Sequence, residues 1–184
     1  MGKGISNVLG FLLIITLTLI LSISIFIFNI NLQKTPFVCV KDSKILPKSG
    51  NAWWEEQVVE LIHMGGDKID VKDLKILIEV YRNDVIIKKG VLDDFPWKCN
   101  STFIRKRIVG DVIIQTSPHN CTKFLGELHY KKDGSWDVGD KIGFRIKYEN
   151  SGEGIDLVSG DIVRITLIYK PLNNVIYSKD MIVS

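Results

Sequence analysis

One uncharged apolar run near the amino terminus constrains this chain more than any other feature. Residues 5–33 contain no ionisable side chain, whereas all the charged residues (24 basic plus 21 acidic, 45 in total) except Lys3 lie from Lys34 onward. From Ile5 to Ile30 the run is apolar on every side of a helix. A helix of all the uncharged residues 5–33 would be about 44 Å long at 1.5 Å per residue, more than the roughly 30 Å hydrocarbon core of a membrane. We therefore expect residues 5–33 to form a helix that lies in lipid or among copies of itself.

The few flanking charges predict the orientation of this helix. Lys3 and the initial amine precede the run, and the positive-inside bias places residues 1–4 in the cytoplasm and everything after Lys34 outside. The run is longer than the central region of a secretory signal peptide, and no small-x-small cleavage site follows Ile30. We expect the helix to be retained as a single-pass anchor in the plasma membrane.

The start of the run carries a family resemblance. It resembles the processing site of archaeal type IV pilins in one stretch, Lys3-Gly4-Ile5-Ser6-Asn7-Val8-Leu9-Gly10. The resemblance implies that residues 1–4 are a class III leader peptide, removed after Gly4 by a membrane-embedded prepilin peptidase so that the mature chain begins at Ile5. Glycine suits the position before the cleaved bond, because a side chain there would obstruct close approach of the peptidase to the backbone.

Two positions depart from the family pattern. Asn7 stands where the family often has proline, and Leu9 stands where bacterial pilins carry a glutamate, which archaeal relatives commonly lack. Without that carboxylate, the resemblance implies assembly through apolar helix packing, with Ser6, Val8, Leu9 and Gly10 among the packing residues. The alternative is a plain anchor that is never cleaved.

A period of two dominates residues 34–184. Apolar residues occupy alternate positions in three segments, 74–81, 142–148 and 163–169, which is typical of half-buried strands. Further strands are predicted at 38–41, 57–63, 85–88, 103–109, 112–115 and 175–183. Turns are predicted at Asn83-Asp84, Gly110-Asp111, Asp133-Gly134 and 171–174, and a loop at 41–50. These features predict an all-β, β-sandwich-like head domain over residues 34–184, so that the whole chain is of the α+β class.

Three short motifs extend the resemblance into the head. His63-Met64-Gly65-Gly66-Asp67 resembles the His-x-Gly-Gly-Asp segment of many archaeal pilin heads, and Gly139-Asp140 and Gly160-Asp161 resemble the Gly-Asp strand openings of that family. Physically, we interpret Gly65-Gly66 as a turn and Asp67 as an acceptor for its free amides. This structural role of His63, Gly65, Gly66 and Asp67 is favoured over a metal site built on His63 and Asp67.

The sequence offers little for catalysis or for nucleic-acid binding. A dispersed net charge of +3 is too small for a nucleic-acid groove. No HExxH, paired CxxC, GxSxG or phosphate-loop motif occurs, and the stretch that begins at Asp133 lacks the glycine and glutamate of a calcium loop. The adjacent carboxylates Asp93 and Asp94 are interpreted as solvated. We expect neither an enzyme nor a cofactor or bound metal.

Three cysteines in an exterior domain allow one disulfide and leave one thiol over. Cys99 and Cys121 are the preferred pair, which leaves Cys39 free. Two alternatives stay open: a disulfide that includes Cys39, and three reduced thiols. Asn100 and Asn120, each adjacent to one of the preferred cysteines, begin glycosylation motifs. Our hypothesis is a cystine-tied, glycan-bearing flap over residues 99–122.

These observations favour a structural subunit of an archaeal type IV pilus-like surface filament. The partners implied by the resemblance are the prepilin peptidase, a platform protein, the assembly ATPase, and sibling subunits in a helical homo-oligomer. The protein would lie in the membrane before assembly and in a cell-surface filament afterwards. The alternative is a permanently anchored extracellular β-domain that binds a solute, sugar or surface protein. Major and minor pilins, and roles in adhesion, motility or DNA uptake, are not distinguished by the sequence.

Overall fold

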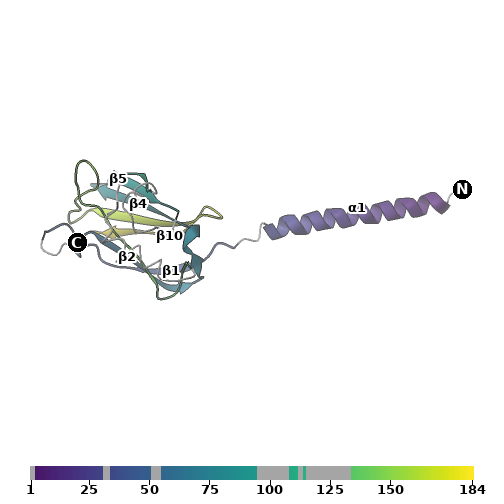
Figure 1. Ribbon diagram of the computed structural model, residues 1–184. Coiled ribbons are helices and arrows are strands. Elements are labelled where there is room, and N and C mark those ends of the chain that lie inside the picture. Colours follow the sequence, from purple (N-terminus) through teal and green to yellow (C-terminus); the bar gives the residue numbers. More distant parts are fainter. Residues whose placement is uncertain (1–2, 31–33, 51–54, 95–107, 112–113, 115–133) are drawn as a thin grey trace. The chain divides into compact units, whose positions relative to one another are not determined.

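A computed structural model describes residues 3–30, 34–50, 55–94, 108–111, 114 and 134–184. The chain divides into two units, Met1–Lys34 and Thr35–Ser184, within one residue of the boundary expected from the charge distribution. Figure 1 shows the helix of the first unit and the strands of the second, which we call the head.

The first unit contains one helix, α1 (Lys3–Ile30), of 28 residues. The expected helix extended to residue 33, and residues 31–33 lie outside the described part. The segment Val8–Phe26 is long and apolar enough to cross a membrane. At about 1.5 Å per residue, the whole helix measures roughly 42 Å.

Within the described residues, the head is built from antiparallel strands in three sheets. A three-stranded sheet has the order β1 (Val38–Asp42), β2 (Val58–Gly66) and β8 (Lys141–Arg145). A five-stranded sheet has the order β10 (Asn174–Ile182), β9 (Ile162–Tyr169), β4 (Leu74–Arg82), β5 (Val85–Leu92) and β6 (Ile108–Gly110). A short pair, β3 (Ile69–Asp70) with β7 (Ser135–Trp136), flanks a 3-10 turn at Val71–Asp73.

The two larger sheets face each other as layers of a sandwich, with β1 and β2 in one layer and β4, β5 and β10 in the other (Figure 1). Side chains from both layers form a single hydrophobic core, among them Leu61 of β2, Ile78 of β4 and Ile165 of β9, each with no exposed surface. The alternation expected at 74–81 is confirmed, because Leu74, Ile76, Ile78 and Val80 all point into this core. The α+β class, a long apolar helix followed by an all-β head, is therefore correct.

The turn residues explain how the strands connect. Asn83 and Asp84 have φ angles of 52° and 62° and join β4 to β5, as predicted for a tight hairpin. Gly139 and Gly160, with φ near 90°, precede Asp140 and Asp161 at the starts of β8 and β9. In both places the aspartate carboxylate accepts the amide proton of the residue three positions earlier, at 2.8 and 2.9 Å. The two Gly-Asp strand openings are thus the same turn used twice.

Several local predictions need correction. The predicted loop at 41–50 is anchored in the core, since Ile45 is fully buried and bridges to Val183. Strand β5 continues past Lys88 to Leu92, which also lies in the core. Asp93 is not simply solvated: it accepts a 2.9 Å bond from Lys170. Of the strands predicted at 103–109 and 112–115, only 108–109 and 114 lie within the described part.

Candidate functional surfaces

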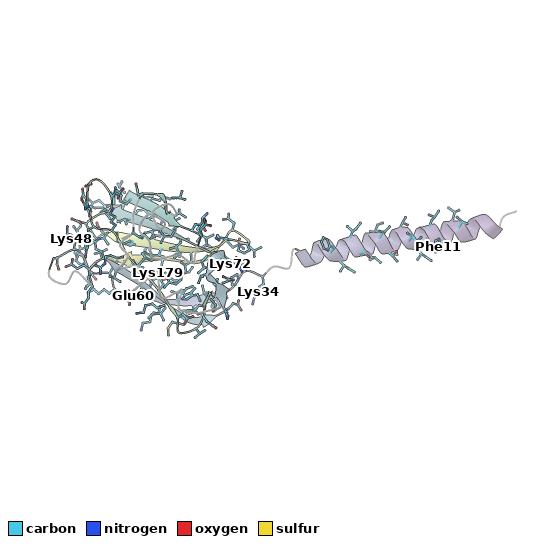
Figure 2. The ribbon with its side chains drawn as sticks, viewed as in Figure 1. Phe11, Lys34, Lys48, Glu60, Lys72 and Lys179 are labelled. Carbon is cyan, nitrogen blue, oxygen red and sulfur yellow. The ribbon has the colours of Figure 1, made fainter. Side chains whose placement is uncertain are left out.

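The most extensive exposed apolar surface among the described residues belongs to α1. Large apolar side chains of α1 between Val8 and Phe26 are exposed on all sides of the helix, with exposed fractions from 38% for Ile15 to 67% for Phe26. Figure 2 shows these side chains, including Phe11, projecting in every direction around the helix. A surface of this kind is stable only in lipid or against other apolar surfaces.

The hydroxyl groups of α1 do not change this apolar character. Thr16 donates to the carbonyl oxygens of Leu12 and Leu13 at 3.0 and 2.9 Å, and Ser24 donates to that of Ile20 at 2.8 Å. Thr18 bonds its own helix in the same way. Because these three hydroxyls are bonded within their own helix, they are not required to bond a neighbour.

The predicted processing and packing residues lie in the first turns of α1. Lys3, Gly4, Ile5 and Ser6 have helical backbone, and their side-chain surroundings lie outside the described part. Val8 and Leu9 are exposed by 60% and 62%, and a methyl group built at Gly10 would meet nothing within 4 Å. Val8, Leu9 and Gly10 are therefore available to a neighbour, while the packing role of Ser6 and cleavage after Gly4 stay predictions.

The His-x-Gly-Gly-Asp segment forms a clamp rather than the predicted turn. Gly65 and Gly66 are the last residues of β2, paired with Cys39 and Val38 of β1, so the turn interpretation is wrong. Gly66 has a φ of +111°, and a Cβ there would lie 2.1 Å from the carbonyl oxygen of Phe37. Glycine is needed because the backbone of Phe37, just before β1, approaches this closely.

Asp67 closes the clamp by bonding both backbone groups of Phe37. Its amide donates to the Phe37 carbonyl at 2.7 Å, and its carboxylate accepts from the Phe37 amide at 2.9 Å. The predicted role of Asp67 as an acceptor of backbone amides is thus correct, but the amide comes from Phe37, the residue before β1. Sequence analysis missed this partner because it lies 30 residues earlier in the chain.

His63 lies fully buried beneath this clamp. Its Nε2 donates to the main-chain carbonyl oxygen of Asp67 at 3.1 Å, and its ring contacts Trp136 edge-on at 4.8 Å between centroids. The Asp67 carboxylate instead bonds Phe37, so His63 and Asp67 are not arranged as metal ligands. Within the described residues, no group of three or more His, Cys, Asp or Glu side chains is placed to hold a metal ion.

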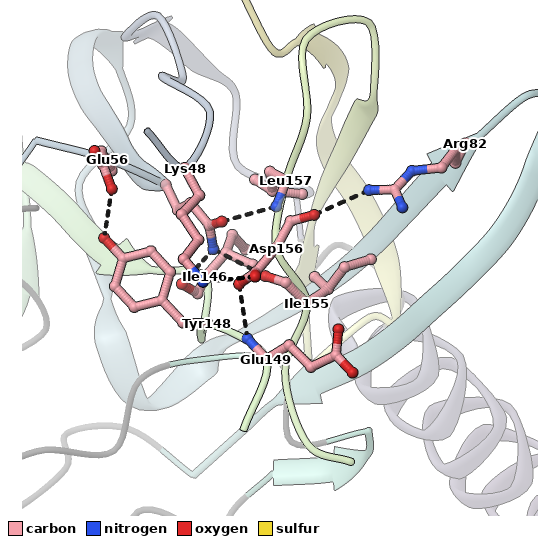
Figure 3. A network of polar contacts seen from close by, with 10 residues as sticks. Lys48, Glu56, Arg82, Ile146, Tyr148, Glu149, Ile155, Asp156 and Leu157 are labelled. Atoms are coloured by element: carbon pink, nitrogen blue, oxygen red, sulfur yellow. Dashed lines mark hydrogen bonds and ion pairs between the residues drawn. The ribbon is translucent and has the colours of Figure 1, made fainter. Parts of the chain in front are cut away.

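Gln57, just before β2, is fully buried, and its side-chain amide bonds three backbone groups of the β8–β9 connection. Its Nε2 donates to the carbonyls of Ile146 and Ile155 at 3.1 and 3.0 Å, and its Oε1 accepts from the Leu157 amide at 2.7 Å. Figure 3 shows this network together with the contacts of Asp156. Every polar atom of the Gln57 amide group is bonded to backbone, which indicates a structural role.

Asp156 and Arg82 continue the network at the surface. Lys48 pairs with the Asp156 carboxylate at 2.6 Å, which raises the pKa of Lys48, while Arg82 donates to the Asp156 carbonyl at 2.9 Å (Figure 3). Arg82 also holds Asp161 with two bonds of 2.8 Å. Burial alone raises the pKa of the Asp161 carboxyl, but Arg82 and the Val158 amide outweigh burial, so the pKa lies below its ordinary value. The arrangement fixes a loop and offers no nucleophile with a base.

The cysteines and glycosylation motifs fall mostly outside the described part. Cys39 is a free, exposed thiol on β1. Cys99, Cys121, Asn100 and Asn120 lie outside the described residues, so the preferred disulfide and the glycan-bearing flap stay predictions.

Comparison with known proteins adds no family assignment. No protein-family profile matches the chain, and no curated protein matches it significantly. The resemblance to archaeal pilins therefore rests on the short motifs quoted above.

Proposed function

We propose that this chain is a structural subunit of an archaeal type IV pilus-like surface filament. It is made as a membrane-anchored precursor, cleaved after Gly4, and polymerised through α1. The observation that carries the proposal is the combination of an all-round apolar helix with the run Lys3-Gly4-Ile5 at its start.

The chemistry of α1 supports a transfer from lipid to a bundle of like helices. Lipid tails and neighbouring apolar helices cover the same side chains, so movement between them need not expose the helix to water. The bonded hydroxyls of Thr16, Thr18 and Ser24 support such a transfer as well, because those polar groups keep the same partners in both surroundings.

The head supports the proposal through what its polar groups do. Gln57, Asp67 and Asp161 each fasten backbone segments to one another, as expected of a compact and protease-resistant cap. Partners in this proposal are the peptidase, a platform protein with its ATPase, and sibling subunits. The membrane holds the subunit before assembly, and the cell surface carries the filament afterwards.

Amino-terminal sequencing of the mature protein tests the cleavage. The native chain is expected to begin at Ile5, and the Gly4→Val variant is expected to keep residues 1–4 because the larger side chain blocks the peptidase. Gly10→Val is the matched control, since the added side chain meets nothing within 4 Å in α1 and this variant should still begin at Ile5.

Electron microscopy of shed surface material tests the assembly. Filaments that contain the cleaved chain are expected from the native protein and not from Gly4→Val. A native chain that begins at Met1 or Gly2 and stays as single molecules in membranes would instead establish the permanently anchored binding domain.

A further inference from the structure

The outer face of the five-stranded sheet carries a row of alternating charges. The register places Lys89 of β5 opposite Glu79 of β4, then Arg164 of β9, then Asp180 of β10. The order across the sheet is therefore plus, minus, plus, minus. We call these four residues the charge ladder.

Close contacts fix the charge ladder in place. Lys89 pairs with Glu79 at 2.7 Å, and Arg164 pairs with Asp180 through bonds of 2.6 and 2.8 Å. Tyr81 joins the two pairs, because its hydroxyl accepts from Arg164 at 3.0 Å and donates to Glu79 at 3.3 Å. The side chains of Lys89, Arg164 and Asp180 remain 40–53% exposed.

An apolar row runs beside the charge ladder, two residues along β4, β9 and β10 and, across a register shift, three residues along β5. The register aligns Ile86, Tyr81, Ile162 and Ile182 across the same four strands. Ile86 and Ile182 at its two ends are 46% and 65% exposed. Water therefore contacts both ends of this row in a single copy.

These two rows together match a second copy of the same face. Consider two copies related by a twofold axis that lies parallel to the strands, between β4 and β9. The axis reverses the order of the charge ladder across the sheet, and it sets each row opposite the same row of the other copy. Lys89 of one copy then faces Asp180 of the other, and Glu79 faces Arg164. The apolar row faces the apolar row of the other copy, which would cover the exposed side chains of Ile86 and Ile182.

We infer that two heads associate face to face through the charge ladder and the apolar row. Sheets packed in this way lie about 10 Å apart, a distance that lysine and arginine side chains can bridge. The axis keeps the strands of the two copies in the same direction, so Thr35, where each chain enters its head, lies at the same end in both. Two subunits anchored in one membrane can thus form this contact, which does not depend on cleavage after Gly4.

Zero-length carbodiimide cross-linking of the full chain in native membranes tests the contact. Within one copy Lys89 and Asp180 are three strands apart, about 14 Å, too far for a zero-length bond. We expect mass spectrometry to recover a peptide pair in which an amide bond joins Lys89 to Asp180. When 14N-labelled and 15N-labelled chains are expressed together, this amide should join a 14N chain to a 15N chain. Lys179 and Asp42, 2.6 Å apart in one copy, provide the internal control for the reaction.

A matched pair of variants separates a specific contact from crowding. Ile182→Asp places a charge within the apolar row. It is expected to lower the yield of the Lys89–Asp180 cross-link about tenfold or more. Met64→Asp, at a 53% exposed position on the other sheet, is expected to leave it unchanged. A Lys179–Asp42 product without any Lys89–Asp180 product would overturn the inference, and so would an equal loss of the Lys89–Asp180 product in both variants. Either result would leave the amino-terminal test of the proposed function unaffected.

Discussion

The helix and the head satisfy their polar groups in opposite ways. In α1, Thr16, Thr18 and Ser24 bond carbonyls three or four residues away. In the head, Gln57 bonds Ile155 across 98 residues, and Lys179 bonds Asp42 across 137. The hydroxyls of Thr16, Thr18 and Ser24 therefore find their partners within the helix, without neighbours. The head depends on distant parts of its own chain, and a change in one unit should leave the other intact.

The strongest test of this independence removes a large core side chain from the head. Trp136 has no exposed surface, contacts His63 and donates to the Asp140 carbonyl at 3.2 Å. Trp136→Ala is expected to lower the free energy of unfolding of the head by about 3–5 kcal/mol. Its Tm should fall by roughly 10 °C in near-UV circular dichroism of the full chain, with membrane anchoring unchanged. Val138→Ala, at a 55% exposed neighbour, is the control, and an equal fall in its Tm would contradict the prediction.

A charge in α1 should have the converse effect. Ile20 lies near the middle of the apolar segment and is 63% exposed in the isolated chain. Ile20→Arg is expected to cost about 3 kcal/mol of insertion free energy and to reduce the membrane-bound fraction, while the Tm of the head stays the same. Ile20→Leu should behave as the native chain. A fall in the head Tm with Ile20→Arg would show that the two units are coupled.

Acid should weaken the head through Asp161. Because the folded-state pKa of this carboxyl lies below its unfolded value, its contribution is complete above the unfolded pKa and is lost as pH falls through the folded pKa. The loss is expected below about pH 4 and amounts to about 1–3 kcal/mol. Asp161→Asn should flatten this part of a pH titration of the free energy of unfolding.

The smallest effect is expected from the helix hydroxyls. Thr16→Val removes a hydroxyl that bonds only Leu12 and Leu13 of its own helix, so membrane anchoring and filament yield should stay within a factor of about two of the native values. Quantitative blotting of membrane and shed fractions measures both. A tenfold drop in filament yield would indicate that Thr16 bonds a neighbouring helix.

The sequence predicted those features that depend on local patterns. Alternation at 74–81 and 163–169 placed β4 and β9 to within one residue, and Asn83-Asp84 marked the hairpin because both residues tolerate positive φ. The Gly-Asp motifs likewise marked the starts of β8 and β9. In each case the residues that form the structure are neighbours in the chain.

The missed features depend on partners far away in the chain. Gly65 and Gly66 looked like a turn, because nothing near them reveals that β1 passes close enough to exclude a Cβ. Asp93 looked solvated because Lys170, which pairs with it, lies 77 residues later. The charge ladder was also invisible, since its four members come into line only when the registers of β5, β4, β9 and β10 are known.

The course of β10 has a practical consequence for labelling the protein. Thr35, where the chain arrives, accepts a bond from Asn174 at the start of β10, and the strand then runs nine residues to Ile182. At about 3.4 Å per residue this carries the chain roughly 30 Å to the opposite end of the head. An epitope fused after Ser184 would project from that opposite end, away from the clamp at Phe37. An antibody against the epitope would then report surface display without disturbing the attachment of the head.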